Sequence, residues 1–233
     1  MTSELFSKKG AIFDLDGTLL DSMGVWRQID VAFFSRRNIA LPNDFMGAIT
    51  PMQPYQAAVY TVNRFGLNES PDAVLQEWTD MAFDEYRNRL ELKPYVREYI
   101  GLLASRGVRM SVASSSDRRM VEAALRRNQI RDQMEFIITS AEIGCAKGTP
   151  DIYLACAKAM NLEPGECAVY EDIIEGIRGA GKGGFYTVGV YEESYRRDRE
   201  RSSRMPVESD LFIRSFGDLM EGEAHIFESK MMR

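Results

Sequence analysis

The stretch GAIFDLDGT, at residues 10–18, joins a short apolar run to a turn that contains two aspartates. An apolar run that stops abruptly at polar residues is typical of a buried parallel strand that ends in a loop. We therefore predict a first strand at residues 10–13, with Asp14 and Asp16 at its carboxyl end. Open parallel sheets bind ligands at that edge, and Gly17 permits a tight turn close to a bound group.

Further apolar runs follow, and helix-like segments separate them from residue 108 onward. The runs are residues 108–113, 136–139, 168–170, 186–190 and 211–213. This alternation predicts an α/β fold with a doubly wound parallel sheet. Local signals agree, because Asp117 can cap a helix over residues 118–128, and Thr149 followed by Pro150 can begin another.

The stretch between the first strand and residue 108 has no strand candidate, but it has helical patterning at residues 25–37, 54–65 and 71–90. We interpret it as an inserted α-helical domain, and Pro94 as the residue that begins the helix leading back into the sheet. The predicted organisation is a core of residues 1–22 and 93–221, a helical domain of residues 23–92 and a C-terminal tail of residues 222–233.

The composition is that of an ordinary soluble protein, with 45% apolar and 27% charged residues. No stretch approaches the roughly 18 consecutive apolar residues of a membrane helix, and the N-terminus has no apolar core of a signal peptide. We therefore expect a cytoplasmic protein without a membrane partner. The net charge of -6 argues against nucleic-acid binding. An Arg-rich stretch lies at residues 195–204. Glu192 and Glu193, just before it, stand four residues ahead of Arg196 and Arg197, and this spacing predicts a solvated helix face.

Several chemistries lack their essential residues. The only histidine, His225, lies in the predicted tail, so Ser-His-Asp and phosphohistidine catalysis have no base or nucleophile in the core. None of the three cysteines is followed six positions later by the arginine that a cysteine-based phosphatase needs. Gly179, Gly181 and Gly184 match a dinucleotide-binding pattern, but they close a predicted helix and precede a strand, the reverse of what that loop requires.

More polar residues lie at or near predicted strand ends. Ser114, the first of three serines after the second predicted strand, could hold a phosphate, or the serines could cap the next helix. Lys147 could place a positive charge on a phosphate, or lie on the surface. Glu171 and Asp172 are adjacent carboxylates that repel each other unless they are exposed or bound to a cation such as Mg²⁺. With Asp14, these residues offer a nucleophile, a hydroxyl, a lysine and metal ligands in order along the chain.

The sequence IFDLDGTLLDS at residues 12–22 resembles the first motif of the haloacid dehalogenase superfamily. The other three motifs are matched in order, by VASSS at residues 112–116, KGTPD at residues 147–151, and YED at residues 170–172 with Gly176 and Ile177. The long insertion between the first two motifs resembles the helical cap of the subfamily that contains phosphoglycolate phosphatase and beta-phosphoglucomutase. The resemblance covers nearly the whole chain.

The resemblance implies a magnesium-dependent phosphatase that acts on a small phosphorylated metabolite. Asp14 would attack phosphorus to form an aspartyl phosphate, and Asp16 would protonate the leaving group and then activate water. The implied Mg²⁺ ligands are Asp14, the backbone carbonyl of Asp16, Asp172 and Glu171. The implied phosphate-binding residues are Ser114, Ser115 and Lys147.

Two other functions remain open. For a sugar-phosphate mutase, the resemblance leads us to expect a histidine where this chain has Trp26, and an arginine near residues 50–52. Neither is present, and residues 23–92 carry six basic and nine acidic side chains, so we prefer hydrolysis. A non-catalytic binding or regulatory module could lose a catalytic residue, whereas this chain keeps every expected group.

The predicted cap also offers candidate substrate contacts, which are Trp26, Arg27, Tyr55 and Gln56. An aromatic residue at helical spacing can instead belong to the core of the helical domain. Two positions depart from the family pattern, Ile173 where serine is common and Tyr95 where glycine is common. These departures make it unsafe to transfer a substrate from any single relative, and the sequence predicts no oligomeric state.

Overall fold

The computed structural model of the chain describes residues 4–49, 52–194, 199–220 and 227–228. The chain forms two compact units. The sheet unit contains residues 1–23 and 90–233, and the helical unit contains residues 24–89.

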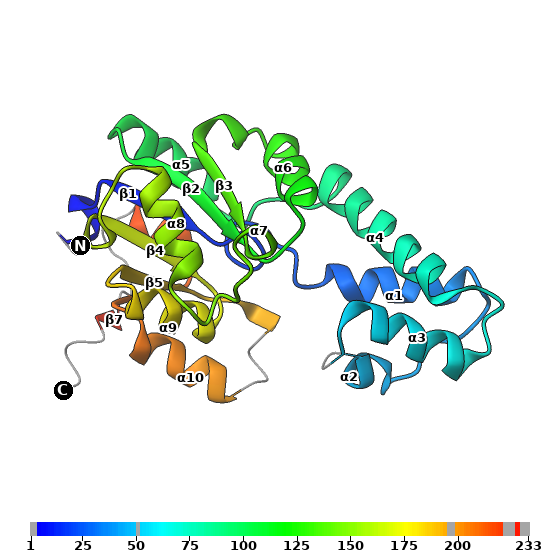
Figure 1. Cartoon of the computed structure of the whole chain (residues 1–233). Helices are drawn as coiled ribbons and strands as arrows, with labels where there is room; N and C mark the ends of the chain where they lie inside the picture. Colours follow the sequence, from blue (N-terminus) through cyan, green and yellow to red (C-terminus); the bar gives the residue numbers. More distant parts are fainter. Residues whose placement is uncertain (1–3, 50–51, 195–198, 221–226, 229–233) are drawn as a thin grey trace. The chain divides into compact units, whose positions relative to one another are not determined.

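The sheet unit is built on a seven-stranded sheet in the order β3-β2-β1-β4-β5-β6-β7 (Figure 1). The strands are β1 Gly10–Phe13, β2 Arg109–Ser114, β3 Phe136–Thr139, β4 Cys167–Glu171, β5 Tyr186–Val190, β6 Leu211–Ile213 and β7 Phe227–Glu228. Strands β1 to β6 are parallel, and β7 pairs with β6 in the antiparallel direction. The predicted doubly wound α/β fold is confirmed, and β1, β3, β5 and β6 have the predicted bounds.

Different helices cover the two faces of this sheet. The crossovers to β2 and β3 contain α5 Val96–Ser105 and α6 Arg118–Arg127, and β3, β4 and β5 are followed by α8 Asp151–Ala159, α9 Ile174–Lys182 and α10 Arg199–Glu208. Because parallel crossovers are right-handed and the order of the strands reverses between β1 and β4, α5 and α6 cover one face, whereas α8, α9 and α10 cover the opposite face. The reversal lies between β1 and β4, and doubly wound sheets bind ligands at such a point.

Strand β1 is an interior strand of the sheet and is buried on both faces. Ile12 packs into a buried cluster that includes Tyr153 of α8, while Phe13 stacks on Tyr170 of β4 with ring centroids 4.6 Å apart. Full burial of each such side chain contributes roughly 1.5–3 kcal/mol. Packing on both faces therefore fixes the position of Asp14, the residue that follows β1.

Helix starts in the sheet unit follow the predicted caps only in part. The Asp117 carboxylate accepts a hydrogen bond from the Arg119 backbone nitrogen at 2.8 Å and caps α6, as predicted. Thr149 does not cap α8, because its hydroxyl donates to the Ala146 carbonyl at 3.0 Å and the helix begins only at Asp151.

Tyr95 corrects the prediction that Pro94 begins α5. The helix starts at Val96, and Tyr95 before it adopts the left-handed conformation with a φ of 66°. That conformation costs a residue other than glycine about 1–2 kcal/mol. The Tyr95 ring packs against Gly217, where an added Cβ would lie 2.9 Å from the ring, and this contact offsets part of the strain.

The helical unit contains α1 Val25–Ser35, α2 Phe45–Ile49, α3 Pro54–Phe65 and α4 Pro71–Asn88. The sequence predicts α1, α3 and α4, whereas α2 is too short to show helical periodicity. Aromatic side chains join the helices. Phe34 of α1 makes edge contacts with Phe45 of α2 and Phe65 of α3, at 4.8 Å and 4.7 Å between ring centroids. Phe33 contacts Trp78 of α4 at 5.4 Å, so one buried aromatic cluster holds all four helices.

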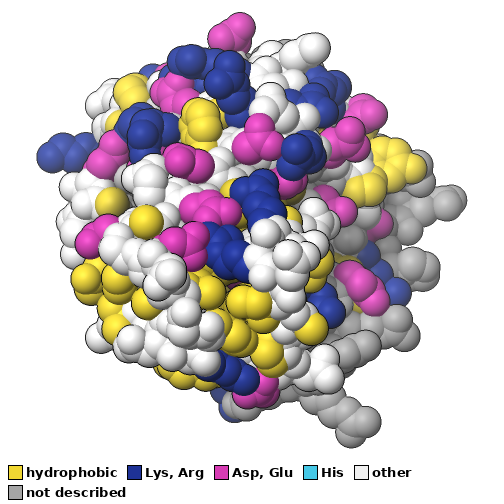
Figure 2. Space-filling view, turned by 90° about the vertical axis from the view of Figure 1, so that its right-hand side faces the viewer, with side chains coloured by type: hydrophobic (Ala, Val, Ile, Leu, Met, Phe, Trp, Pro, Cys, Tyr) yellow, Lys and Arg dark blue, Asp and Glu magenta, His cyan; other side chains and the backbone are white. Residues whose placement is uncertain are grey.

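Four of the six arginines in the helical unit are paired with carboxylates. The ion pairs are Arg36–Glu77, Arg37–Glu69, Arg37–Glu77, Arg64–Asp44, Arg89–Asp84 and Arg89–Glu85. Figure 2 shows basic and acidic side chains interspersed over one face of the molecule, beside an apolar area. Exposed pairs contribute about 0–1 kcal/mol each, so their main effect is to neutralise positive charge.

Asp30 of α1 is a buried carboxyl group, 5% exposed. Burial raises the pKa of Asp30 to about 6, whereas an unfolded chain has a pKa of about 3.9. The folded state therefore binds more protons between about pH 4 and 6, and this carboxyl lowers stability as the pH rises through that range. We expect Asp30→Asn to stabilise the helical unit by up to about 3 kcal/mol at pH 8 and to change little at pH 4.

Urea unfolding followed by tryptophan fluorescence measures this effect, because both tryptophans, Trp26 and Trp78, lie in the helical unit. Asp80→Asn is the matched control, since Asp80 is exposed on α4. An Asp30→Asn effect of the same size at both pH values would contradict the account.

Several expectations concern the last third of the chain. Glu192, predicted on a solvated helix face, is buried after β5, and its carboxylate pairs with Lys93 at 2.9 Å, so the prediction is wrong for this residue. Arg196, Arg197 and His225 lie outside the described residues. Within the predicted tail, two residues form β7.

Of the helices in the described ranges, none combines the length and the apolar character needed to cross a membrane.

Candidate active site

Polar side chains converge at the carboxyl edge of the sheet. Asp14 follows β1, Ser114 ends β2, and Glu171 ends β4 and is followed by Asp172. These three strands are neighbours in the order β2-β1-β4. Lys147 reaches the same place from the loop between α7 Ser140–Ile143 and α8.

The Lys147 ammonium is the positive centre of this group. It forms ion pairs with Asp14 and, at 2.8 Å, with Glu171. Burial by itself would lower the pKa of Lys147, but the charges of Asp14 and Glu171 together outweigh burial and raise the pKa. The lysine therefore stays charged at physiological pH.

Glu171 is fully buried and is held at one of its two oxygens. Its Oε1 accepts hydrogen bonds from the Tyr153 hydroxyl and from the Lys147 ammonium, both at 2.8 Å, while its Oε2 has no hydrogen-bond partner. Burial is the main cause that raises the pKa of Glu171 to about 7, against the opposing charge of Lys147. Gly176 gives this carboxylate room, because an added Cβ there would lie 2.4 Å from the carboxyl carbon.

Asp172 has a similar arrangement. Its Oδ1 accepts a hydrogen bond from the Thr18 hydroxyl at 3.3 Å, and its buried Oδ2 has no hydrogen-bond partner. Burial, followed by the charges of Asp14 and Glu171, raises the pKa of Asp172 well above its usual value. Gly17 has a φ of 81°, and an added Cβ would lie 2.3 Å from Oδ2, so this position requires glycine.

The carboxylates of Asp14, Glu171 and Asp172 fit a hard divalent cation. One oxygen from each lies within 4.8 Å of the others, and all three side chains are buried. Three buried carboxylates around a single lysine leave an excess of negative charge, and two of their oxygens lack a partner. Ligand sets made of oxygen alone suit Mg²⁺ or Ca²⁺ rather than softer metals. This group can therefore hold a divalent metal ion.

Asp16 lies outside this three-carboxylate group. It is half-buried, and its Oδ2 accepts a hydrogen bond from the Ser116 hydroxyl at 2.7 Å. Ser114 is fully buried, and its hydroxyl accepts from the Ser116 backbone nitrogen at 3.0 Å. Ser115 is exposed, and its hydroxyl pairs with that of Ser140 at 3.3 Å. Of the predicted phosphate-binding residues, Ser115 thus has the least support from the geometry.

The four predicted cap contacts all belong to the helical unit. Trp26 and Tyr55 are each 49% exposed, so they are not core residues of that unit. Arg27 is exposed, and the Gln56 side chain accepts a hydrogen bond from the Gln53 backbone nitrogen at 3.2 Å, in a capping box at the start of α3. Their contact with a substrate stays a prediction.

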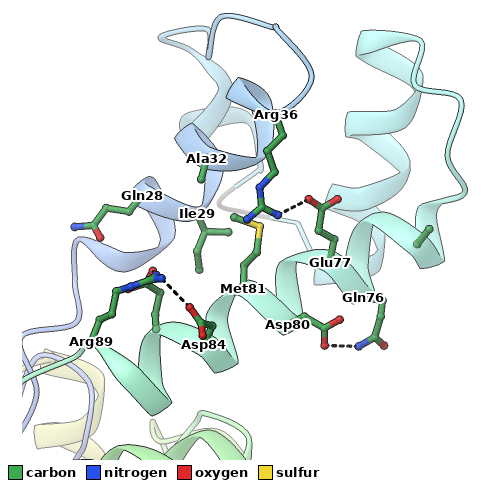
Figure 3. A pocket seen from close by; sticks show the side chains of 12 residues that line it. Gln28, Ile29, Ala32, Arg36, Gln76, Glu77, Asp80, Met81, Asp84 and Arg89 are labelled. Carbon is green, nitrogen blue, oxygen red and sulfur yellow. Dashed lines mark hydrogen bonds and ion pairs between the residues drawn. The ribbon is translucent and has the colours of Figure 1, made fainter.

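A groove of about 640 Å³ lies between α1 and α4 of the helical unit (Figure 3). Its lining includes the apolar side chains of Ile29, Ala32 and Met81, together with charged residues. The ion pairs Arg36–Glu77 and Arg89–Asp84 neutralise its arginines. None of the sequence-predicted site residues lines this groove, and its arginines are occupied, so we do not place phosphate chemistry here.

Sequence reasoning missed Tyr153, Thr18 and Ser116 as parts of the site. Tyr153 had a recognisable signal, because a tyrosine between Ile152 and Cys156 on a buried helix face requires a hydrogen-bond partner for its hydroxyl. Thr18 and Ser116 stand inside quoted motifs, but their partners can be identified only from the folded chain.

Known proteins share this architecture. A family model described as haloacid dehalogenase-like hydrolase matches residues 8–184. The putative phosphatase YhcW of Bacillus subtilis (strain 168) is 27% identical, with 78% of this chain and 83% of the relative covered. Hexitol phosphatase B of Escherichia coli (strain K12) is 25% identical, with 72% of this chain and 76% of the relative covered.

The fold is shared with solved structures. The crystal structure of a putative beta-phosphoglucomutase from Thermotoga maritima has a TM-score of 0.73 and 20% identity, over 79% of this chain and 86% of that chain. The matched family segment contains every candidate active-site residue of the sheet unit, from Asp14 to Asp172. The chain therefore belongs to the haloacid dehalogenase-like hydrolases, as its motifs implied.

Proposed function

We propose that the chain is a magnesium-dependent phosphatase that hydrolyses a small phosphate monoester through an aspartyl-phosphate intermediate on Asp14. The observation that carries the proposal is the buried group of Asp14, Glu171 and Asp172 around Lys147. It combines a candidate nucleophile, a cation and two carboxylate oxygens without hydrogen-bond partners. The relatives named as phosphatases support hydrolysis of phosphomonoesters.

Asp14 is the proposed nucleophile. One of its oxygens forms a bond to phosphorus, and the bond from phosphorus to the ester oxygen breaks, with its electron pair leaving on that oxygen. The Lys147 ammonium already lies against Asp14, so it can stabilise negative charge on the transferring phosphoryl group. Ser114, buried at the end of β2, is the proposed hydroxyl donor to the same group.

Asp16 is the proposed acid and base. It would donate a proton to the departing oxygen, and then remove a proton from the water that attacks the aspartyl phosphate. The Ser116 hydroxyl donates to Asp16 Oδ2 at 2.7 Å, and this bond fixes the orientation of the carboxyl group for both proton transfers.

The proposed ligands of Mg²⁺ are the carboxylates of Asp14, Glu171 and Asp172, with the Asp16 backbone carbonyl as a further predicted ligand. When bound, the ion supplies positive charge that reduces the repulsion between the carboxylate nucleophile and the phosphate. The Tyr153 hydroxyl donates a hydrogen bond to Glu171, and the Thr18 hydroxyl donates one to Asp172. These two bonds orient the carboxylates.

Hydrolysis is preferred to a mutase reaction because of the charges in the helical unit. A mutase must hold an intermediate with two phosphates, which requires cations in addition to those at the catalytic group. Four of the six arginines of the helical unit are already paired. Among the predicted cap contacts, Arg27 alone is basic. A monophosphate with an uncharged leaving group is the substrate that suits these residues best. The proposed location of the enzyme is the cytoplasm.

Metal removal tests the proposal. We expect phosphate release to fall at least about 100-fold when EDTA removes divalent ions, and to return when Mg²⁺ is added. Ca²⁺ is expected not to restore it, because its bonds to oxygen are about 2.3–2.6 Å long, against about 2.0–2.1 Å for Mg²⁺. The esters compared are hexitol phosphates, sugar 1-phosphates, phosphoglycolate, nucleotides and an aryl phosphate. Release that persists in EDTA would contradict the metal assignment, and isomerisation of a sugar 1-phosphate without phosphate release would favour the mutase.

A further inference from the structure

We propose that Lys93 is a positioning residue for the reaction proposed above, on which this inference rests. Its ammonium holds in place the loop that carries Asp14 and Asp16, and Glu192 is the counter-charge that fixes Lys93. Lys93 lies just beyond the helical unit, where the chain returns to the sheet unit.

The Lys93 ammonium uses all of its hydrogen-bond donors. It donates hydrogen bonds to the Gly17 carbonyl at 2.8 Å, to the Tyr191 carbonyl at 2.7 Å and to Glu192 Oε2 at 2.9 Å. An ammonium has three N–H donors, so these three acceptors use all of them. The Lys93 and Glu192 side chains are 15% and 6% exposed. A charged pair this well shielded from water holds one geometry much more firmly than an exposed pair does.

Gly17 is the point at which this cation acts on the catalytic group. Its Cα lies directly beside Asp172 Oδ2, as the 2.3 Å separation from an added Cβ shows. Its carbonyl accepts from Lys93. The Gly17 residue is thus held between a carboxylate of the proposed metal site and the Lys93 ammonium, and a shift of Gly17 would displace Asp16, its neighbour in the chain.

The same segment of chain contacts this loop a second time through its backbone. The Lys93 nitrogen donates to the Leu19 carbonyl at 2.9 Å, and the Asp21 nitrogen donates to the Glu91 carbonyl at 3.0 Å. These bonds do not depend on the side chain at position 93, so a substitution there should leave the connection folded. What the side chain adds is a cation among three acceptors.

Without that cation, the Gly17 and Tyr191 carbonyls and the Glu192 carboxylate would converge with no donor between them. Buried acceptors that lose their partner must move apart or admit water. Gly17 belongs to a loop, whereas Tyr191 directly follows β5. We therefore expect the loop at Gly17 to take up most of the movement.

Lys93→Met tests the proposal, because methionine keeps most of the length of lysine and removes the charge. In the magnesium-loaded full-length enzyme, we expect kcat to fall about 10- to 100-fold with KM changed less than about threefold, since small displacements of reacting groups cost rate rather than binding. Lys9→Met is the matched control. It removes an exposed lysine that pairs with Glu166 at 2.7 Å just before β1, at the other end of the strand from Asp14, and should keep the kcat of the natural enzyme.

Glu192→Gln provides a second variant that keeps an acceptor oxygen and removes the negative charge. We expect a smaller loss of kcat than for Lys93→Met, and the double variant should lose no more than Lys93→Met alone, because the two residues act as one unit. If Lys93→Met does not fold, the kcat and the loop exchange of Glu192→Gln test the inference in its place.

Hydrogen exchange of the loop gives a readout that does not depend on turnover. The loop amides of Gly17 and Leu19 donate to the Leu20 and Leu15 carbonyls. In Lys93→Met, we expect exchange in a peptide spanning residues 14–20 to be at least about tenfold faster, with Lys9→Met unchanged. If the natural enzyme releases no phosphate from any ester, the proposed function fails, while this exchange experiment still tests the anchoring by Lys93.

Two results would overturn the inference. One is a folded Lys93→Met or Glu192→Gln enzyme with unchanged kcat and unchanged loop exchange. The other is a loss of activity that simply follows the unfolded fraction of each variant, measured by circular dichroism at the assay temperature.

Discussion

Asp14→Asn is expected to lower phosphate release by at least about 10⁴-fold, because the substitution removes the proposed nucleophile. The asparagine amide has nearly the shape of the carboxylate, so the loss should appear in kcat while the fold persists. Asp132→Asn is the matched control. Asp132 is an exposed carboxylate just before β3, at the opposite edge of the sheet, and its replacement should leave turnover unchanged.

The stability of Asp14→Asn provides an independent check. Without metal, Asp14, Glu171 and Asp172 repel one another around a single lysine. The charge of Asp14 disfavours ionisation of both neighbours, so its removal should raise the melting temperature of the metal-free protein, and Mg²⁺ should stabilise the variant less than it stabilises the natural enzyme. If the folded variant retained more than about a hundredth of the natural turnover, Asp14 could not be the nucleophile.

Lys147→Met carries the second largest expected effect. We expect kcat to fall about 10²- to 10³-fold, the usual cost of removing one preorganised group that stabilises the transition state. The metal-free protein should also lose about 3–5 kcal/mol of stability, because Asp14 and Glu171 lose the cation that they share, and each must then keep an uncompensated buried charge or bind a proton. Saturating phosphate-release kinetics and urea unfolding measure the two effects.

Metal affinity separates this role from a simple loss of structure. Removing the Lys147 charge leaves the three carboxylates more negative, so Mg²⁺ should bind Lys147→Met at least as tightly as it binds the natural enzyme. Lys158→Met, an exposed position on α8, is the matched control and should change none of these quantities. Weaker Mg²⁺ binding in a folded Lys147→Met protein would show that the lysine organises the site rather than the phosphoryl group.

The sequence predicted the strands well because their signal is local. Phe136–Thr139 lies between Glu135 and Ser140, and Tyr186–Val190 comes soon after Gly183 and Gly184. Such short, mainly apolar runs have few other interpretations. Convergence of Asp14 with Glu171 could also be predicted, since parallel neighbouring strands end at the same edge. Short or irregular features were missed for the opposite reason. The five residues of α2 are too few to show a period.

Contacts between distant segments explain the wrong prediction at Glu192. Glutamates four residues before arginines on a chain suggest a helix surface, but Glu192 pairs with Lys93, which lies 99 positions away. No local pattern encodes that choice. The same holds for Tyr95, because the contact that offsets part of the cost of its left-handed backbone is made with Gly217, from another part of the chain. Burial, and the partners that burial requires, could be read only from the folded structure.

The proposed mechanism requires that Asp14 becomes phosphorylated, and trapping the phosphoenzyme would detect this step. We would mix Asp16→Asn with Mg²⁺ and an aryl phosphate, whose leaving group needs little protonation, then quench in acid and map the peptides by mass spectrometry. Without Asp16 as a base, hydrolysis of the intermediate should be slow enough for it to accumulate. We expect one added phosphoryl group on the peptide that contains Asp14, removed by hydroxylamine. Phosphate release without any labelled peptide, or a label on a different residue, would contradict the proposed mechanism.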